Sequence, residues 1–484
     1  MKLNNPELLL SQCLINGEWC DALSGKREAV INPATGAELA SIPLVSEEET
    51  QQAIAAAQRA QNEWKQLTAK QRSALLLAWA DKVLAAQEDL AQLMTAEQGK
   101  SLAEARGEVA YAASFITWFA EEAKRVDGAV LQAPQASQRL VVVKQPIGVC
   151  AAITPWNFPA AMITRKVAPA LAAGCAIIVK PAEQTPLTAL ALAKLAQDAG
   201  IPAGVLQVVT GEAAQVGKVL CDSPVVRKLS FTGSTEVGRI LMAQCAPSIK
   251  KLSLELGGNA PVIVFDDANL DAAVAGIMAS KFRNSGQTCV CANRIYVQDG
   301  IYERLAEKLV AAVEQLKVGD GSQEGTTQGP LIDSDAVAKV QSHIDDALIK
   351  GAQIATGGQP HALGGTFFQP TVVTGVTQKM RFAKEETFGP VAPLFRFHDE
   401  AEAIAMANDT EFGLAAYLFT QNAARQWRVP EALEYGMVGI NTGLISNEVA
   451  PFGGVKQSGL GREGSRYGIE EYLELKYLCI DVSC

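Results

Sequence analysis

The spacing of hydrophobic and polar positions changes character along the chain. Residues 47–125 are rich in Ala, Leu, Glu, Gln and Lys, which favour the α-helix, and a polar segment at 127–138 interrupts this region. From 141 onward, short apolar runs alternate with longer helical stretches. The pattern predicts a mainly helical N-terminal region followed by an α/β region.

Between 148 and 245 the alternation is regular enough to predict individual elements. We expect strands at 148–153, 176–179, 205–209 and 225–231, and helices at 160–173, from 212 and from 235. A further helix is expected after Thr185 as its N-cap, with Pro186 in its first position and Gly200 just past its end. This order predicts a parallel sheet covered on both faces by helices.

A second α/β series follows the boundary at Gly257-Gly258. It begins with a strand at 261–265 and has helices near 268–281, 300–316 and 334–350. The run 472–480 is strand-like, apolar and aromatic, and has no obvious partner nearby in the sequence. We therefore expect it to complete a sheet with another subunit.

Composition narrows the class of protein. The chain has 484 residues, of which 48% are hydrophobic, and a net charge of -10, which excludes disorder and argues against nucleic-acid binding. The longest apolar run, 167–179, is broken by Pro169 and Gly174 and is shorter than the roughly 20 residues that a membrane span needs. We expect no membrane partner.

Cysteine and histidine usage limits the chemistry. The first 20 residues lack the pattern of a secretory signal, so ten cysteines indicate free thiols in a reducing cytoplasm. The three histidines, His343, His361 and His398, have no ligand partner at zinc spacing. We therefore expect neither a metal site nor a histidine-based catalytic triad.

Two segments suit a nucleotide. Phe231-Thr-Gly-Ser-Thr-Glu-Val-Gly238 lies between a predicted strand and helix, where free N–H groups favour phosphate. Gly459-Leu-Gly-Arg-Glu-Gly464 matches G-x-G-x-x-G but lacks a βαβ context, so we interpret it as a structural loop. Lys180-Pro-Ala-Glu183 ends a predicted strand, where an acidic residue can accept hydrogen bonds from ribose hydroxyls and repel a 2′-phosphate.

Three further segments offer reactive groups. Cys289 follows Gly286 in a turn and is a candidate nucleophile, although a free thiol needs activation. Glu255 lies between two leucines, and an apolar environment raises a carboxyl pKa towards that of a general base. Asn157 lies in a turn stiffened by prolines and aromatics and can donate to an oxyanion. Each also has an ordinary structural interpretation.

Taken together, these segments resemble motifs of the aldehyde dehydrogenase superfamily, in order and over nearly the whole chain. The matching motifs are 155–159, 180–183, 231–238, 254–258, 286–289, 385–390 and 451–454. The resemblance implies two parallel-sheet Rossmann-type domains and a small bridging β-sheet. We expect a cofactor-binding domain at 1–126 and 145–256, a catalytic domain at 257–455, and bridging segments at 127–144 and 456–484.

The resemblance also implies roles for individual residues. Cys289 is the expected nucleophile, Asn157 with the Cys289 N–H the oxyanion site, and Glu255 the base that activates water. The expected cofactor-binding residues are Trp156, Lys180, Glu183, Gly233, Ser234, Gly238, Leu256, Glu386 and Phe388. Glu183 favours NAD over NADP by charge repulsion, while use of both remains open.

Longer stretches resemble the succinate-semialdehyde dehydrogenases of this superfamily. That resemblance implies that Arg165, Arg283 and Ser446 bind the distal carboxylate of a semialdehyde, and suggests a role in 4-aminobutyrate degradation. Cys291, two residues after Cys289, resembles the partner in redox-switched relatives, although a packing role is as good an interpretation.

Several alternatives stay open. Glutarate semialdehyde is a second candidate substrate, because one methylene provides only about 1–3 kcal/mol of discrimination. A coenzyme A-acylating enzyme fits less well because Glu255 is present. A cysteine hydrolase would need a histidine partner, and a non-catalytic relative would have lost Cys289, Glu255 or Asn157. Family analogy further predicts a homotetramer built from two dimers.

Overall fold

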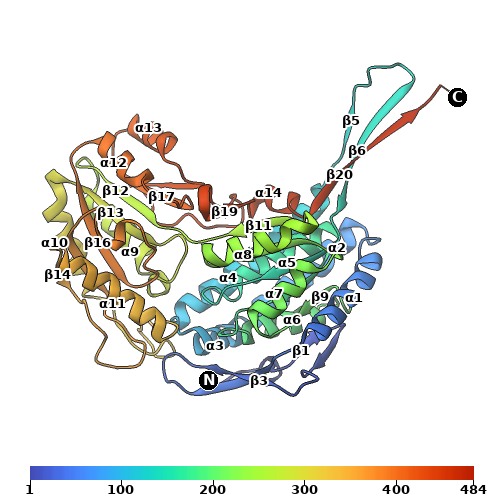
Figure 1. Cartoon of the computed structure of the whole chain (residues 1–484), viewed down its shortest axis with the longest axis horizontal. Helices are drawn as coiled ribbons and strands as arrows, with labels where there is room; N and C mark the ends of the chain where they lie inside the picture. Colours follow the sequence, from blue (N-terminus) through green and yellow to red (C-terminus); the bar gives the residue numbers. More distant parts are fainter. Residues whose placement is uncertain (484) are drawn as a thin grey trace.

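The computed structural model describes residues 1–483. Two α/β units lie side by side, and a narrow sheet extends from one of them (Figure 1). The first unit contains an eight-stranded sheet in the order β19-β11-β10-β7-β8-β9-β1-β2. Its strands are β1 (Cys13–Ile15), β2 (Glu18–Cys20), β7 (Val149–Ile153), β8 (Ala176–Lys180), β9 (Leu206–Val208), β10 (Val226–Thr232), β11 (Lys251–Glu255) and β19 (Gly459–Leu460).

The central strands β11, β10, β7, β8 and β9 of this sheet are parallel. Strand β19 pairs antiparallel at one end, and β1 and β2 continue the sheet antiparallel at the other. Their parallel order and the intervening helices confirm the predicted β-α alternation. The helices are α1 (Glu47–Trp64), α2 (Ala69–Ala85), α3 (Gln87–Gln98), α4 (Leu102–Glu122), α5 (Ala161–Ala173), α6 (Leu187–Asp198), α7 (Ala213–Asp222) and α8 (Thr235–Cys245).

The predicted capping of α6 by Thr185 is wrong. The helix begins at Leu187 and has no side-chain cap from its own segment. Instead, the Glu97 carboxylate on α3 accepts hydrogen bonds from Leu187 N at 2.7 Å and Thr188 N at 2.9 Å. A carboxylate suits the positive end of the helix dipole, so a side chain remote in sequence replaces the expected local cap.

The second unit has a seven-stranded sheet in the order β14-β15-β16-β13-β12-β17-β18, with helices on its faces. Its strands are β12 (Ala260–Val264), β13 (Ala292–Gln298), β14 (Gln353–Thr356), β15 (Thr371–Val376), β16 (Val391–Phe397), β17 (Ala415–Phe419) and β18 (Met437–Ile440). Its helices are α9 (Leu270–Lys281), α10 (Tyr302–Val313), α11 (Ser334–Ile349), α12 (Glu400–Asn408) and α13 (Arg425–Ala432).

The projecting sheet in Figure 1 contains β5 (Ala129–Leu131), β6 (Gln138–Pro146) and β20 (Leu473–Asp481). Strand β20 pairs antiparallel with β6 along its full length. Within the chain its partner lies far earlier in the sequence, and β20 is an edge strand of this sheet, so the expectation that 472–480 completes a sheet with another subunit stays a prediction. Apolar side chains remain exposed on this sheet, including Val130 at 78% and Leu475 at 70%.

The sheets can be compared with the predicted domain ranges. The predicted bridging ranges 127–144 and 456–484 include β5, most of β6 and β20, but β19 in the second range joins the eight-stranded sheet. A hairpin of β3 (Arg27–Ile31) and β4 (Glu38–Pro43) and the short helix α14 (Ser465–Glu470) complete the fold. Among residues 1–483, no helix combines the length and apolarity needed to cross a membrane.

Candidate active site

Cys289 lies in a tightly held loop between α9 and β13. The preceding residues Asn284, Ser285 and Gly286 all have left-handed backbones, with φ of 51°, 54° and 74°, which is costly for the two non-glycine residues. Asn284 N donates to Glu104 Oε1 at 2.7 Å, and Ser285 Oγ donates to a backbone carbonyl at 3.0 Å. These bonds stabilise the turn that places Cys289.

The Cys289 thiol is half-buried at the end of this loop. Burial raises its pKa to about 12, against the opposing effect of the Arg165 guanidinium. On the other side of the loop, Tyr417 Oη donates to the carbonyl of Val290 at 2.8 Å. The thiol is therefore protonated at neutral pH and needs a base to become a thiolate.

Asn157 lies directly beside this loop. Its Nδ2 donates to Gln287 O at 2.9 Å, which leaves a second amide hydrogen to donate elsewhere. The Asn157 carbonyl accepts from Lys100 Nζ at 2.8 Å and from Asn284 Nδ2 at 3.0 Å. Both the backbone and the side chain of Asn157 are therefore fixed relative to the loop that carries Cys289.

Glu255 is the last residue of β11 and is 3% exposed. Neither carboxylate oxygen has a hydrogen-bond partner among the described residues. Burial raises the Glu255 pKa well above its usual range, and the Glu463 carboxylate raises it further, while Arg165, Lys166 and Arg462 lower it. This environment makes Glu255 a much stronger base than an exposed carboxylate.

One cavity of about 340 Å³ joins these groups to many of the predicted cofactor residues. The residues from the sequence predictions that line it are Trp156, Asn157, Gly233, Ser234, Glu255, Leu256, Cys289, Glu386 and Phe388. They come from both α/β units, so the cavity exists only where the two units meet. Lys339 on α11 also lines it, and no local sequence pattern identified that residue.

The cavity walls fit a dinucleotide. Ser234 caps α8 and accepts from Val237 N at 3.3 Å, so this helix start faces the cavity with its positive end. A Cβ at Gly238 would lie 2.5 Å from a Leu256 methyl carbon, so only glycine allows that close packing. The Phe388 and Trp156 rings meet edge to face at 5.6 Å.

Glu386 is a further acidic residue in the lining of this cavity. Its Oε1 accepts from Gly258 N at 3.1 Å, and burial raises its pKa to about 7. A carboxylate in this position can accept a hydrogen bond from a sugar hydroxyl when it is deprotonated.

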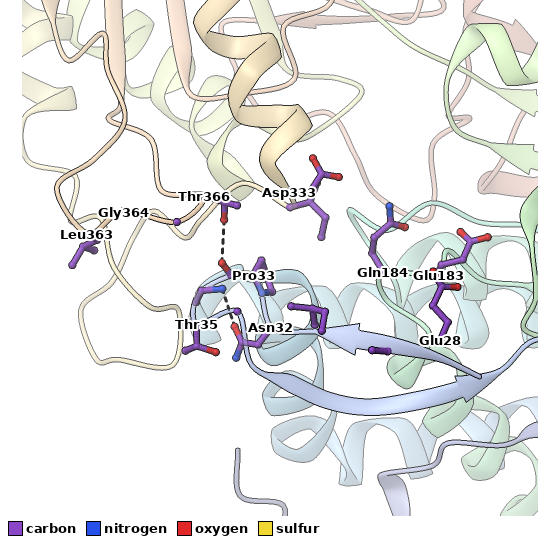
Figure 2. A pocket seen from close by; sticks show the side chains of 16 residues that line it. Glu28, Asn32, Pro33, Thr35, Glu183, Gln184, Asp333, Leu363, Gly364 and Thr366 are labelled. Atoms are coloured by element: carbon purple, nitrogen blue, oxygen red, sulfur yellow. Dashed lines mark hydrogen bonds between the residues drawn. The ribbon is translucent and has the colours of Figure 1, made fainter. Parts of the chain in front are cut away.

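Glu183 lines a second, neighbouring cavity of about 550 Å³ (Figure 2), whereas Lys180 is not among its lining residues. Lys180 is 2% exposed and forms an ion pair with Glu183, and burial lowers its pKa. Figure 2 shows Glu28 and Glu183 at the same end of this cavity. Asp333 lines both cavities, so the two spaces adjoin.

The three predicted substrate residues lie outside the lining of either cavity. Arg165 on α5 is 1% exposed, and its Nε lies 3.0 Å from Glu463 Oε2. Arg283 is half-buried, with Cζ 4.8 Å from the centre of the Phe158 ring, and it has no ion-pair partner within residues 1–483. Ser446 is half-buried in the loop after β18.

The glycine-rich loop 459–464 has a role that sequence reasoning missed. It supplies strand β19, which pairs with Glu255 and its neighbour. It also supplies Glu463, which contacts both Arg165 and Lys166. The interpretation as a structural loop overlooked this carboxylate, because nothing in the sequence shows that it meets α5.

Cys291 follows Cys289 by two residues and directly precedes β13. It is fully buried, and its Sγ donates to Lys281 O at 3.3 Å. A redox partnership with Cys289 stays a prediction, and this hydrogen bond fits the alternative packing role equally well.

The comparisons with known proteins agree over nearly the full length. The family model described as the aldehyde dehydrogenase family matches residues 19–478. The chain is 65% identical to the succinate-semialdehyde dehydrogenase [NADP(+)] of Escherichia coli, over 99% of this chain and 100% of that protein. It is 64% identical to the glutarate-semialdehyde dehydrogenase of Pseudomonas putida, over 100% of each chain.

One further relative and one solved structure are also similar to this chain over nearly its full length. A 3-sulfolactaldehyde dehydrogenase of Pseudomonas putida is 64% identical over 99% of both chains. The solved structure of a succinate-semialdehyde dehydrogenase from Burkholderia pseudomallei has a TM-score of 0.99 and 63% identity, over 100% of both chains. These matches confirm the α/β fold and the resemblance first seen in the motifs: the chain belongs to the aldehyde dehydrogenase family.

Proposed function

We propose that this enzyme oxidises succinate semialdehyde to succinate with NAD or NADP. The observation that carries the proposal is a pair of arginines: Arg165 acts on the Cys289 thiol, and Arg283 begins the turn that leads to Cys289. Arg165 is close enough to lower the Cys289 pKa, and Arg283 has no ion-pair partner in the described chain. Guanidinium groups bind carboxylates bidentately, so an aldehyde that carries a distal carboxylate fits this site.

The names of the relatives support an anionic substrate. They are named for succinate semialdehyde, glutarate semialdehyde and 3-sulfolactaldehyde, and each of these aldehydes carries a carboxylate or a sulfonate. Glutarate semialdehyde remains the second candidate, because a relative with that name is 64% identical. Its one extra methylene changes binding by only about 1–3 kcal/mol.

Cys289 forms the covalent intermediate in this proposal. Its thiolate attacks the aldehyde carbon to form a C–S bond, and the carbonyl oxygen becomes an alkoxide. The free amide hydrogen of Asn157 and the Cys289 N–H donate to that oxygen, which stabilises the charge that develops. Because the thiol pKa is about 12, its proton has to be taken up as the substrate binds, and Glu255 is the buried base beside it.

Glu255 then serves the second half of the reaction. Glu255 first passes the proton taken from Cys289 to solvent. Once the thiohemiacetal has been oxidised to a thioester, the Glu255 carboxylate accepts a proton from a water molecule, whose oxygen attacks the thioester carbon. The C–S bond breaks, the acid leaves, and Cys289 is regenerated as a thiolate. The raised pKa of Glu255 suits it to removing this proton.

The residues that line the 340 Å³ cavity fit a nicotinamide dinucleotide. In our proposal, Ser234 and the start of α8 hold the pyrophosphate, Lys180 and Glu183 the adenosine ribose, and Glu386 and Phe388 the nicotinamide ribose and ring. A nicotinamide held by these residues would supply the hydride acceptor for the oxidation. The two apolar rings Trp156 and Phe388 limit the access of water to that face.

We also propose a homotetramer of two dimers in a reducing, cytoplasmic compartment. Exposed apolar residues on the projecting sheet, such as Leu475 at 70% and Tyr477 at 57%, would be buried by a second copy. Val237 and Ile240, one turn apart on α8 and 41% and 50% exposed, form a second apolar surface. Light scattering tests this proposal: we expect four chains, and fewer chains for Leu475→Asp.

The proposed activity is tested with a panel of substrates under reducing conditions, and the absorbance of the reduced cofactor measures the rate with each one. Succinate semialdehyde, glutarate semialdehyde and the neutral aldehyde butanal are compared with NAD and with NADP. We expect the highest kcat/KM for succinate semialdehyde. A higher value for glutarate semialdehyde would select the alternative, and a preference for butanal would overturn the carboxylate site.

A further inference from the structure

Tyr111 brings a second kind of donor to the proposed carboxylate site. It lies on α4, and its ring meets that of Phe115 edge to face at 4.9 Å. The Phe115 ring in turn lies 5.4 Å from Arg165 Cζ. One face of α4 therefore places the phenol next to the buried guanidinium on α5.

The loop that carries Ser446 is attached to the same stretch of α4. Ser114 Oγ lies 2.8 Å from the Tyr111 carbonyl oxygen and 3.3 Å from Glu448 Oε2, so its single hydrogen is shared between these two acceptors. This contact holds the 441–450 loop against the turn of helix that contains Tyr111. The phenol, Arg165 and Ser446 thus come from three separate segments that meet at one place.

Two buried donors at this place lack an acceptor. Tyr111 Oη and Arg165 Nη2 are both shielded from solvent, and neither donates to an acceptor among residues 1–483; the Ser446 hydroxyl acts on the phenol oxygen only as a donor. Buried donors are almost always paired in folded proteins, because leaving one unpaired is costly. A carboxylate offers two oxygens that can each accept more than one hydrogen bond, so one such group satisfies both donors.

We propose that the Tyr111 hydroxyl donates a hydrogen bond to the distal carboxylate of the substrate, beside Arg165, Arg283 and Ser446. This inference rests on the proposed function, which it deepens by adding a specificity-determining residue. Burial raises the pKa of the phenol, and the two guanidiniums and the Ser446 hydroxyl act in the opposite direction. The hydroxyl remains protonated at neutral pH and is a donor to an anion.

The test replaces Tyr111 by Phe, which removes only the hydroxyl. We expect KM for succinate semialdehyde to rise roughly tenfold or more, because a hydrogen bond to a charged group is lost, while kcat/KM for butanal stays within twofold. The inhibition constant of succinate should rise by a similar factor. Tyr467→Phe, at a site 49% exposed, is the matched control and should change none of these values.

The outcomes separate this inference from the proposed function. If the wild-type enzyme uses butanal as well as succinate semialdehyde and succinate does not inhibit it, the carboxylate site itself fails. If the wild type prefers the anionic substrate but Tyr111→Phe matches it, only the role of Tyr111 is overturned. An equal loss with both aldehydes would indicate a structural role. Tyr111→Met provides the same comparison if the Phe variant folds poorly.

Discussion

The Glu463 carboxylate lies 3.0 Å from the Arg165 guanidinium in an ion pair that is almost completely buried. Lys166 contacts the other oxygen of the same carboxylate. Glu463 also acts on Glu255, whose pKa it raises in addition to the larger effect of burial. A loop near the end of the chain thus sets the charge balance between the proposed substrate site and the proposed base.

This arrangement predicts a pH effect for Glu463→Gln. A base acts only when deprotonated, so activity limited by hydrolysis falls as the pH drops through the Glu255 pKa. Removing the Glu463 charge lowers that pKa, so the acidic limb of the kcat profile should move to lower pH. The measurement is kcat across the pH range with succinate semialdehyde, and an unchanged or raised limb would contradict the prediction.

Arg283 provides a test of substrate charge. Arg283→Ala removes a guanidinium that has no ion-pair partner in the part of the chain described, so the fold should tolerate the change. We expect a loss of about 1.5–3 kcal/mol in binding of succinate semialdehyde and little change with butanal. Arg304→Ala, at an exposed position on α10, is the control, and equal losses with both aldehydes would refute the role.

The role of Glu255 in hydrolysis can be measured separately from the steps that precede hydrolysis. In Glu255→Gln, attack by Cys289 and oxidation can proceed when the reaction starts from a preformed thiolate at high pH, but water is no longer activated. We expect a rapid burst of reduced cofactor, up to one equivalent per site, followed by turnover slowed roughly 10²–10⁴-fold. Stopped-flow absorbance measures this directly, and steady turnover at the wild-type rate would exclude Glu255 as the base.

Glu183 predicts the cofactor preference. Its carboxylate and that of Glu28 both raise the pKa of the buried Lys180, so they add negative charge where a 2′-phosphate would approach. Repulsion between like charges near a protein surface amounts to about 1–3 kcal/mol. Glu183→Ser should therefore raise the NADP/NAD ratio of kcat/KM about tenfold, whereas Glu307→Ser, on the exposed face of α10, should leave that ratio unchanged.

Much of the fold was predictable because its signals are local. The apolar runs at β7, β8 and β10 and the helical spacing of α5 and α8 depend on neighbours within a few residues. Errors arose where a partner is distant. Thr185 is a good N-cap by type, yet Glu97 on α3 caps α6. The register of β20 against β6 likewise depends on segments that are remote in sequence.

The candidate site follows the same division. The sequence alone determined which residues are chemically able to act, since Cys289, Glu255 and Asn157 each lie in a motif whose residue types and order resemble one family. Only the tertiary structure decided which groups meet: Glu463 with Arg165, and Lys339 with the cavity wall. The physical reason is that burial and charge pairing depend on distances between segments that are remote in sequence. These distances set the pKa values of Glu255 and Cys289, and they leave the Tyr111 hydroxyl without a hydrogen-bond acceptor.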